Sequence, residues 1–144
     1  MDIVQKAKEL AHRAHAGQVD KAGQPYIEHV ARVAAAVSDD PEAEAVAWLH
    51  DVLEDCRHTP EWMEAMEFQP RTIAINALHL SREVLRDDGQ YYENIRRHPI
   101  ALRVKLADIA DNADESRLAL LPPDVADRLR KKYAKARKAL GVDE

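Results

Sequence analysis

The most informative part of the chain is the run Ala47-Trp48-Leu49-His50-Asp51-Val52-Leu53-Glu54-Asp55. Residues three and four apart share a face of an α-helix, so Glu54 lies one turn beyond both His50 and Asp51. The apolar residues between them predict a buried helix, and imidazole and carboxylate groups are both ligands of first-row metals. The run therefore suggests a metal site with carboxylates beside it, although an ordinary amphipathic helix with a solvated, charged end has the same spacing.

Composition limits the classes of protein to which the chain can belong. A length of 144 residues fits one domain, so we expect residues 1–144 to form a single folding unit. The formal net charge of −5 argues against binding to a nucleic-acid polymer, but a small anionic substrate can still bind in a locally basic pocket. Cys56 is the single cysteine, which excludes an internal disulfide and favours a cytoplasmic location. No apolar run is long enough to span a bilayer, so no membrane partner is expected.

Helix-forming residues dominate the sequence and β-branched clusters are few, so the chain is predicted to be an all-α bundle. Proline, glycine and capping residues indicate where the helices begin and end. Helices are expected over residues 2–16, 25–37, 42–55, 70–78 and 99–112, with further helices that begin near residues 60, 91 and 122. Residues 17–24 are expected to form a loop that contains two glycines, and residues 82–89 an exposed and mobile segment.

Two residues on other helices have the chemistry to join His50 and Asp51. His29 lies near the buried stripe of its helix, although a lone core histidine is usually only hydrogen-bonded. Asp108 interrupts an apolar helix, which costs stability unless the carboxylate is paired or binds a metal. These four residues come from three different helices. Together they would hold a divalent ion and leave positions open for water.

Several polar residues elsewhere allow two interpretations. Lys21 lies in the glycine-containing loop and could bind a phosphate as a flexible point charge, but a solvated lysine in a surface turn is equally compatible with the sequence. His15 comes at the end of the first predicted helix; it could be functional, but we expect it to satisfy backbone carbonyl groups. The basic residues between positions 128 and 138 are expected to form a solvated helix face.

Four blocks of sequence carry a resemblance to a known family. They are His15-Ala16-Gly17-Gln18, Gly23-Gln24-Pro25-Tyr26-Ile27-Glu28-His29, Leu49-His50-Asp51-Val52-Leu53-Glu54-Asp55 and Val104-Lys105-Leu106-Ala107-Asp108. In this order they resemble the HD-domain metal-dependent phosphohydrolases, and within these the alarmone hydrolases, which include the hydrolase domain of Rel/Spo-type proteins. The resemblance covers most of the chain, from residue 15 to about residue 112, and implies an HD-domain helical bundle.

The resemblance also implies a role for each matching residue. The family's metal ligands, usually for Mn²⁺, match His29, His50, Asp51 and Asp108. The acidic pair that positions and activates the attacking water matches Glu54 and Asp55. The positions around the substrate match Lys21, Tyr26 and Asn112. The family removes the 3′-pyrophosphate of guanosine tetra- and pentaphosphate, so the implied activity is metal-dependent hydrolysis of a small, nucleotide-like phosphate or pyrophosphate ester.

Two positions depart from the family pattern. Asp20 stands where the family usually has an arginine that packs on the guanine base, and Ile109 stands where it tends to have an arginine after the last metal ligand. Because the metal ligands themselves are all present, a phosphohydrolase of another small phosphorylated metabolite is the nearest alternative. The sequence is also compatible with a non-catalytic module that binds nucleotide or metal, and with a purely structural helical protein. It leaves open whether the chain forms a homo-oligomer.

Overall fold

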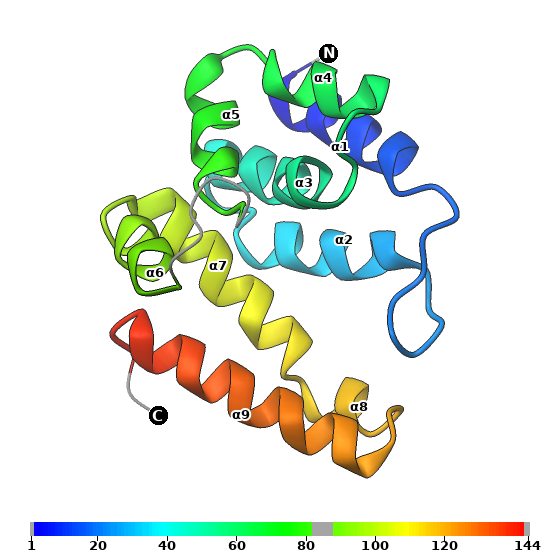
Figure 1. Ribbon diagram of the computed structural model, residues 1–144. Coiled ribbons are helices and arrows are strands. Elements are labelled where there is room, and N and C mark those ends of the chain that lie inside the picture. The colour runs from blue at the N-terminus through cyan, green and yellow to red at the C-terminus, as the bar shows by residue number, and fades with distance from the viewer. Residues whose placement is uncertain (1, 82–87, 143–144) are drawn as a thin grey trace.

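The computed structural model describes residues 2–81 and 88–142, and apart from short connections these residues are helical (Figure 1). The predicted all-α fold is confirmed. The helices are α1 (Ile3–Ala14), α2 (Tyr26–Ala36), α3 (Pro41–Asp55), α4 (Pro60–Met66), α5 (Arg71–Leu78), α6 (Asp88–Arg96), α7 (Pro99–Asn112), α8 (Glu115–Leu118) and α9 (Pro123–Ala139). Within the described residues the only strand-like pairing is an isolated antiparallel bridge between Val19 and Pro25.

Helix α3 is the central element of the fold. It packs against α1, α2, α4, α5 and α7, and Figure 1 shows it between α1 and α2. All residues from Ala45 to Leu53 are buried. A helix that is buried on all sides must be surrounded by other elements. His50 and Asp51 are therefore held inside the core rather than at its edge.

Capping residues fix the positions at which the helices begin. The Asp40 side chain accepts the Glu42 backbone N–H at 3.0 Å and starts α3. Thr59 Oγ1 accepts the Trp62 backbone N–H at 3.0 Å and starts α4 at the predicted position. Such caps satisfy donors that have no partner within the helix. The first helix ends at Ala14, two residues earlier than expected.

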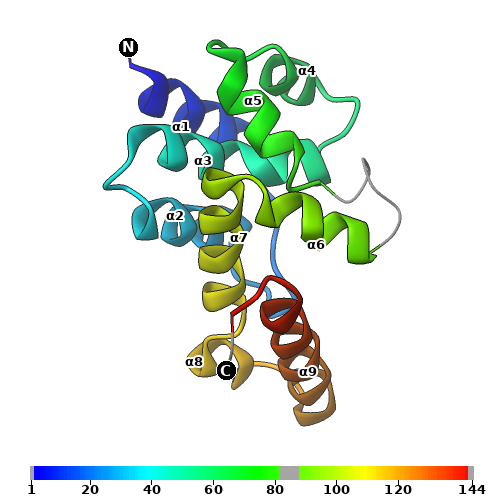
Figure 2. The same ribbon diagram turned by 90° about the vertical axis from the view of Figure 1, so that its left-hand side faces the viewer.

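Helix α7 connects the main core to a smaller layer formed by α8 and α9 (Figure 2). Helix α9 packs against α6 and α7. The α8 and α9 segment also has its own small apolar cluster, which is separate from the main core and consists of Leu118, Ala126 and Leu129. Pairwise contacts of α2, α3 and α7 with one another complete the frame of the site that is described below.

Two parts of the chain differ from the sequence prediction or cannot be compared with it. The short helix α8 was not predicted; it begins where the Asp114 side chain accepts the Ser116 backbone N–H at 2.9 Å. Of the segment predicted to be mobile, residues 82–87 lie outside the described residues, and residues 88 and 89 belong to α6. Among the helices in the described ranges, none has both the length and the apolar character needed to cross a membrane.

Candidate metal centre

Helices α2, α3 and α7 bring the four predicted metal ligands together. His29 comes from α2, His50 and Asp51 from α3, and Asp108 from α7, and each is at most 8% exposed. His29 Nε2 lies 2.9 Å from Asp108 Oδ1, and His50 Nε2 lies 3.3 Å from Asp51 Oδ1 and 3.7 Å from Asp108 Oδ1. Single ligand atoms of His29, Asp51 and Asp108 all lie within 4.8 Å of one another. This is the spacing that one bound ion requires.

The orientation of His50 fits a metal ligand. Its Nδ1–H donates to the Ala47 backbone oxygen at 2.7 Å, which directs Nε2 toward the carboxylates of the cluster. Nε2 is buried and has no hydrogen-bond partner. A buried polar atom without a partner is costly in a native protein and needs an explanation. A divalent ion among these imidazole and carboxylate groups provides one, because both are ligands of Mn²⁺, Fe²⁺ and Zn²⁺.

Without a metal, the cluster is held together by charge. Burial alone would lower the pKa of His50, but the negative charges of Asp51 and Asp108 outweigh it and raise the pKa to about 9. Burial opposes the shift at His29 as well, and hydrogen bonds to Asp108 and Asp111 raise its pKa above the usual value. The same histidines and Lys105 hold the pKa of Asp108 well below its usual value despite burial. The His50 imidazole therefore carries a proton at neutral pH, which a metal would have to displace.

Neighbouring side chains fix the remaining oxygens of the carboxylates. The Tyr26 hydroxyl donates to Asp51 Oδ2 at 2.7 Å. Lys105 Nζ donates to Asp108 Oδ2 at 3.3 Å, and Asn112 Nδ2 donates to Asp108 Oδ1 at 3.4 Å. Partners of this kind orient metal ligands and raise their affinity for the ion.

The acidic pair that follows the ligands lies at the last turn of α3. Glu54 is half-buried, and Asp55 reaches the surface. Partial loss of water around Asp55, followed by the negative charge of Asp51, raises the pKa of Asp55 to about 6. Gln18 Nε2 donates to Asp55 Oδ2 at 3.5 Å. A carboxyl group with a pKa near neutrality is suited to accept a proton from water.

His15 does not have the role that its place in the sequence suggested. Its side chain is buried, and its Nδ1 hydrogen-bonds to Gln18 Oε1 at 2.7 Å instead of to a backbone carbonyl. The turn that places Gln18 there uses Gly17 at φ +82°, a left-handed conformation that favours glycine. Because Gln18 also reaches Asp55, the first helix and α3 are linked beside the metal cluster.

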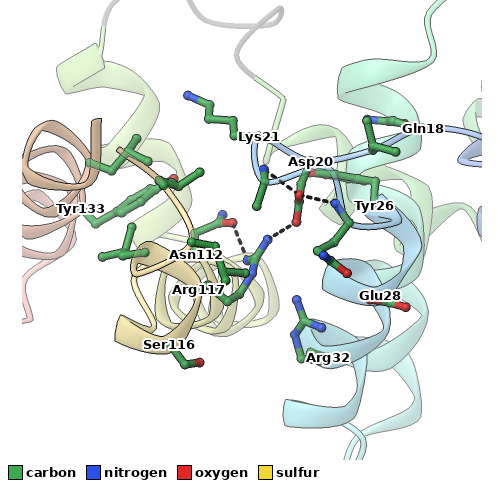
Figure 3. A pocket seen from close by; sticks show the side chains of 17 residues that line it. Gln18, Asp20, Lys21, Tyr26, Glu28, Arg32, Asn112, Ser116, Arg117 and Tyr133 are labelled. Carbon is green, nitrogen blue, oxygen red and sulfur yellow. Dashed lines mark hydrogen bonds and ion pairs between the residues drawn. The ribbon is translucent and has the colours of Figure 1, made fainter. Parts of the chain in front are cut away.

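A pocket of about 490 Å³ opens next to the cluster (Figure 3). Its walls come from the loop before α2, the start of α2, the end of α7, and α8 and α9. Lys21, Tyr26 and Asn112, the predicted substrate-binding residues, all line it. Tyr26, Asn112 and Tyr133 also line a smaller pocket of about 140 Å³ that reaches Asp51 and Asp108. The two pockets thus adjoin at these three side chains, and the smaller one reaches the predicted metal ligands.

Arg117, which no pattern in the sequence indicates, also lies in this pocket. Its guanidinium donates to Asp20 Oδ2 at 2.8 Å and to Asn112 Oδ1 at 3.2 Å (Figure 3). Asp20 Oδ1 accepts the backbone N–H groups of Ala22 and Gln24, both at 2.9 Å. Arg117 lies in a helix of four residues, where no periodic pattern could have identified it.

Comparisons with known proteins support the fold and the resemblance to the Rel/Spo-type proteins. The chain is 31% identical over 156 aligned residues to guanosine-3′,5′-bis(diphosphate) 3′-pyrophosphohydrolase of Vibrio cholerae, an alignment that covers 99% of this chain and 22% of that protein. It is 33% identical to a probable GTP pyrophosphokinase of Mycobacterium leprae, with 99% and 18% covered. The chain thus spans about a fifth of the length of these relatives.

A solved structure has the same fold. It belongs to a metazoan orthologue of SpoT that hydrolyses ppGpp, and it superimposes with a TM-score of 0.74 at 21% sequence identity, covering 97% of this chain and 84% of that one. No protein-family model matches the chain.

Proposed function

We propose that this chain, which is similar in sequence to the Rel/Spo proteins, is a metal-dependent phosphohydrolase that acts on a nucleotide-like pyrophosphate ester, with guanosine 3′,5′-bis(diphosphate) as the first substrate to test. The observation that carries the proposal is the buried group of His29, Asp51 and Asp108, with the unpartnered Nε2 of His50 beside it. A metal-ligand set of this kind next to an open pocket is typical of hydrolytic sites.

We assign the metal to His29, His50, Asp51 and Asp108, and we propose Mn²⁺ as the ion. A bound divalent ion would lower the pKa of a water molecule and stabilise negative charge on phosphoryl oxygens. Imidazoles whose Nε2 atoms face the cluster suit these ligand roles, and so do carboxylates that are fixed by Tyr26 and Lys105.

We assign proton transfer to Asp55 and positioning of the attacking water to Glu54 together with Asp55. With a pKa of about 6, Asp55 is ionised at neutral pH and can accept a proton at Oδ1 or Oδ2. Glu54 directly precedes Asp55 in the last turn of α3.

We place the nucleotide in the pocket that Lys21, Tyr26 and Asn112 line. Lys21 can pair with phosphate, and the adjoining smaller pocket reaches Asp51 and Asp108, where the scissile bond would lie. The net charge of −5 supports a small substrate rather than a nucleic-acid polymer. We further propose that residues 1–144 form one unit, and that the protein is cytoplasmic, which its free, buried Cys56 supports.

Another phosphorylated metabolite is a second candidate substrate, and Asp20 is the residue that favours it. Both Asp20 carboxylate oxygens are occupied by Arg117 and by two backbone N–H groups. The loop itself, residues 17–25, contains no arginine that could stack on a guanine base. Recognition of the base would have to come from other groups in the pocket.

The proposal can be tested with purified protein that is stripped with a chelator, reloaded with Mn²⁺ and offered a panel of phosphorylated nucleotides that includes guanosine tetraphosphate. Release of pyrophosphate from that compound would support the alarmone substrate. Turnover of another nucleotide alone would support the second candidate. His50→Ala and Asp51→Ala should abolish turnover, whereas His12→Ala, on the exposed face of α1, should retain it. Full activity in metal-free protein would refute the proposal.

A further inference from the structure

A carboxylate that belongs to no predicted ligand set holds the far side of His29. Asp111 lies one turn beyond Asp108 on α7, and its Oδ2 accepts the His29 Nδ1–H at 2.6 Å. His29 Nε2 faces Asp108 Oδ1 at 2.9 Å and Asp51 Oδ2 at 3.9 Å. The imidazole is thus held between two carboxylates of the same helix.

The identity of the donor in this contact follows from charge. Two guanidinium groups, those of Arg32 and Arg117, also donate hydrogen bonds to Asp111, so the carboxylate is ion-paired on both oxygens. An ionised carboxylate can only accept, so His29 Nδ1 must carry the hydrogen. A histidine that donates from Nδ1 has its Nε2 lone pair available for a metal, and the carboxylate partner raises its basicity.

Two arginines fix the position of Asp111. Arg32 Nε donates to Asp111 Oδ1 at 2.7 Å, and Arg117 Nη1 donates to Oδ2 at 2.9 Å. The Asp111 side chain is 13% exposed, so little water competes for its oxygens. Paired with cations from α2 and α8, the carboxylate cannot rotate away from His29 without losing charged hydrogen bonds.

Arg117 also connects Asp111 to the pocket loop. Its Nη2 donates to Asp20 Oδ2 at 2.8 Å across 97 residues of sequence. Asp20 Oδ1 closes the turn of the same loop through the backbone N–H groups of Ala22 and Gln24. One guanidinium therefore joins the loop that carries Lys21 to the carboxylate that orients His29.

We propose that Asp111 is a positioning residue that orients His29 for metal binding, and that Arg117, by pairing with both Asp111 and Asp20, makes the pocket loop and the metal ligand one network. This inference rests on the proposed metal site. It goes beyond that site because it assigns roles to Asp111, Arg117 and Asp20, and because it makes metal affinity depend on a loop that contributes no ligand.

The direct test is Asp111→Asn, which keeps the side-chain shape and removes the charge. Metal affinity, measured by calorimetry and by competition with a chelator, should weaken about 10- to 100-fold. The matched control is Asp127→Asn, because Asp127 also pairs with an arginine, Arg130, but lies on the exposed surface of α9. Its affinity should equal that of the wild type.

A second measurement separates positioning from general destabilisation. In Zn²⁺-loaded protein, the ¹⁵N and ¹H signals of the His29 imidazole report the Nδ1–H and its strong hydrogen bond. The downfield Nδ1–H signal should be present in the wild type and in Asp127→Asn, and weakened or lost in Asp111→Asn. A residue with a merely structural role would lower the melting temperature and leave this signal in place.

Two further substitutions test the ion pair between Arg117 and Asp20 of the pocket loop. Asp20→Asn keeps an oxygen for the loop N–H groups but loses the charge that pairs with Arg117, and it should weaken metal binding about two- to fivefold. Arg117→Gln should weaken it at least as much, while Arg130→Gln, the matched surface arginine, should leave it unchanged. Wild-type affinity in Asp20→Asn and in Arg117→Gln would overturn the link to the loop.

The outcomes distinguish this inference from the proposed function. Wild-type affinity in folded Asp111→Asn, with the His29 signal intact, would overturn the role of Asp111 while the metal site stands. A wild-type protein that binds no divalent metal would overturn both.

Discussion

The protonated state of the histidine cluster predicts that metal binding releases protons and depends steeply on pH. With a pKa of about 9, the His50 imidazole is neutral in only about one molecule in a hundred at pH 7. Since a metal binds the neutral imidazole, the apparent Mn²⁺ affinity at pH 7 should be about a hundredfold below its limit at high pH. The affinity should rise about tenfold per pH unit for each proton released.

The pKa of His29 is raised in the same direction, and a proton displaced from His29 would add to the number released. The assay is calorimetric titration of metal-free protein with Mn²⁺ between about pH 6.5 and pH 8, in buffers that differ in ionisation enthalpy. The dependence of the measured heat on the buffer gives the number of protons released. Release of one to two protons at pH 7 is the expected result.

Thermal stability should also depend on pH, and the dependence should differ between metal-free protein and protein with Mn²⁺ bound. A histidine whose folded-state pKa lies above its unfolded value of 6.5 stabilises the metal-free protein below pH 6.5, and this stabilisation is lost as the pH rises towards about 9. The melting temperature of metal-free protein should therefore fall over that range, while the stabilisation gained from added Mn²⁺ grows. Buffer-independent heats, together with an affinity that does not change with pH, would refute this account of the cluster.

Three further predictions concern other parts of the chain. Leu10→Ala removes a fully buried side chain from α1, away from the ligands, and should lower the free energy of unfolding by about 2–5 kcal/mol without changing metal affinity; denaturant titration would contradict this with a loss below about 1 kcal/mol. Burial and the charge of Asp55 raise the pKa of Cys56 to about 11, so at pH 8 its alkylation in folded protein should be about a hundredfold slower than in a thiol of pKa 9, and rapid labelling would contradict it. The Asp55 carboxyl carbon should titrate near pH 6 by ¹³C NMR in metal-free protein and lower with Zn²⁺ bound, because a nearby cation favours the charged form; a titration near pH 4 without metal would contradict it.

The sequence predicts the structure well where apolar residues recur at helical spacing. Buried stripes at helical spacing located the major helices, and His50 and Asp51 stood out because they interrupt the most apolar of them. Asp108 stood out for the same reason on α7. All three are buried in the structure, where the helix contacts bring them together.

The parts that could not be predicted depend on contacts between distant residues. Arg117 meets Asp20 across 97 residues and lies in a helix of four residues, so neither periodicity nor spacing marks it. In the sequence, Asp111 is only a polar residue one helical turn after Asp108. Its proposed role depends on a contact with His29, 82 residues away. The role of His15 depended on the conformation of the turn at Gly17, which brings Gln18 back to it.

The separation of the two apolar clusters has an evolutionary consequence. The predicted metal ligands belong to helices α2, α3 and α7 of the main core, which also takes in Ala136 and Leu140 of α9. Leu118, Ala126 and Leu129 of α8 and α9 form a second cluster, and Leu118 and Leu129 also line the pocket. Substitutions at Leu118 or Leu129 can change the shape of the pocket wall at little cost to the central helix. The pocket can therefore diverge between descendants of this chain while the proposed metal ligands, and the Asp111 and Arg117 that support them, are inherited unchanged.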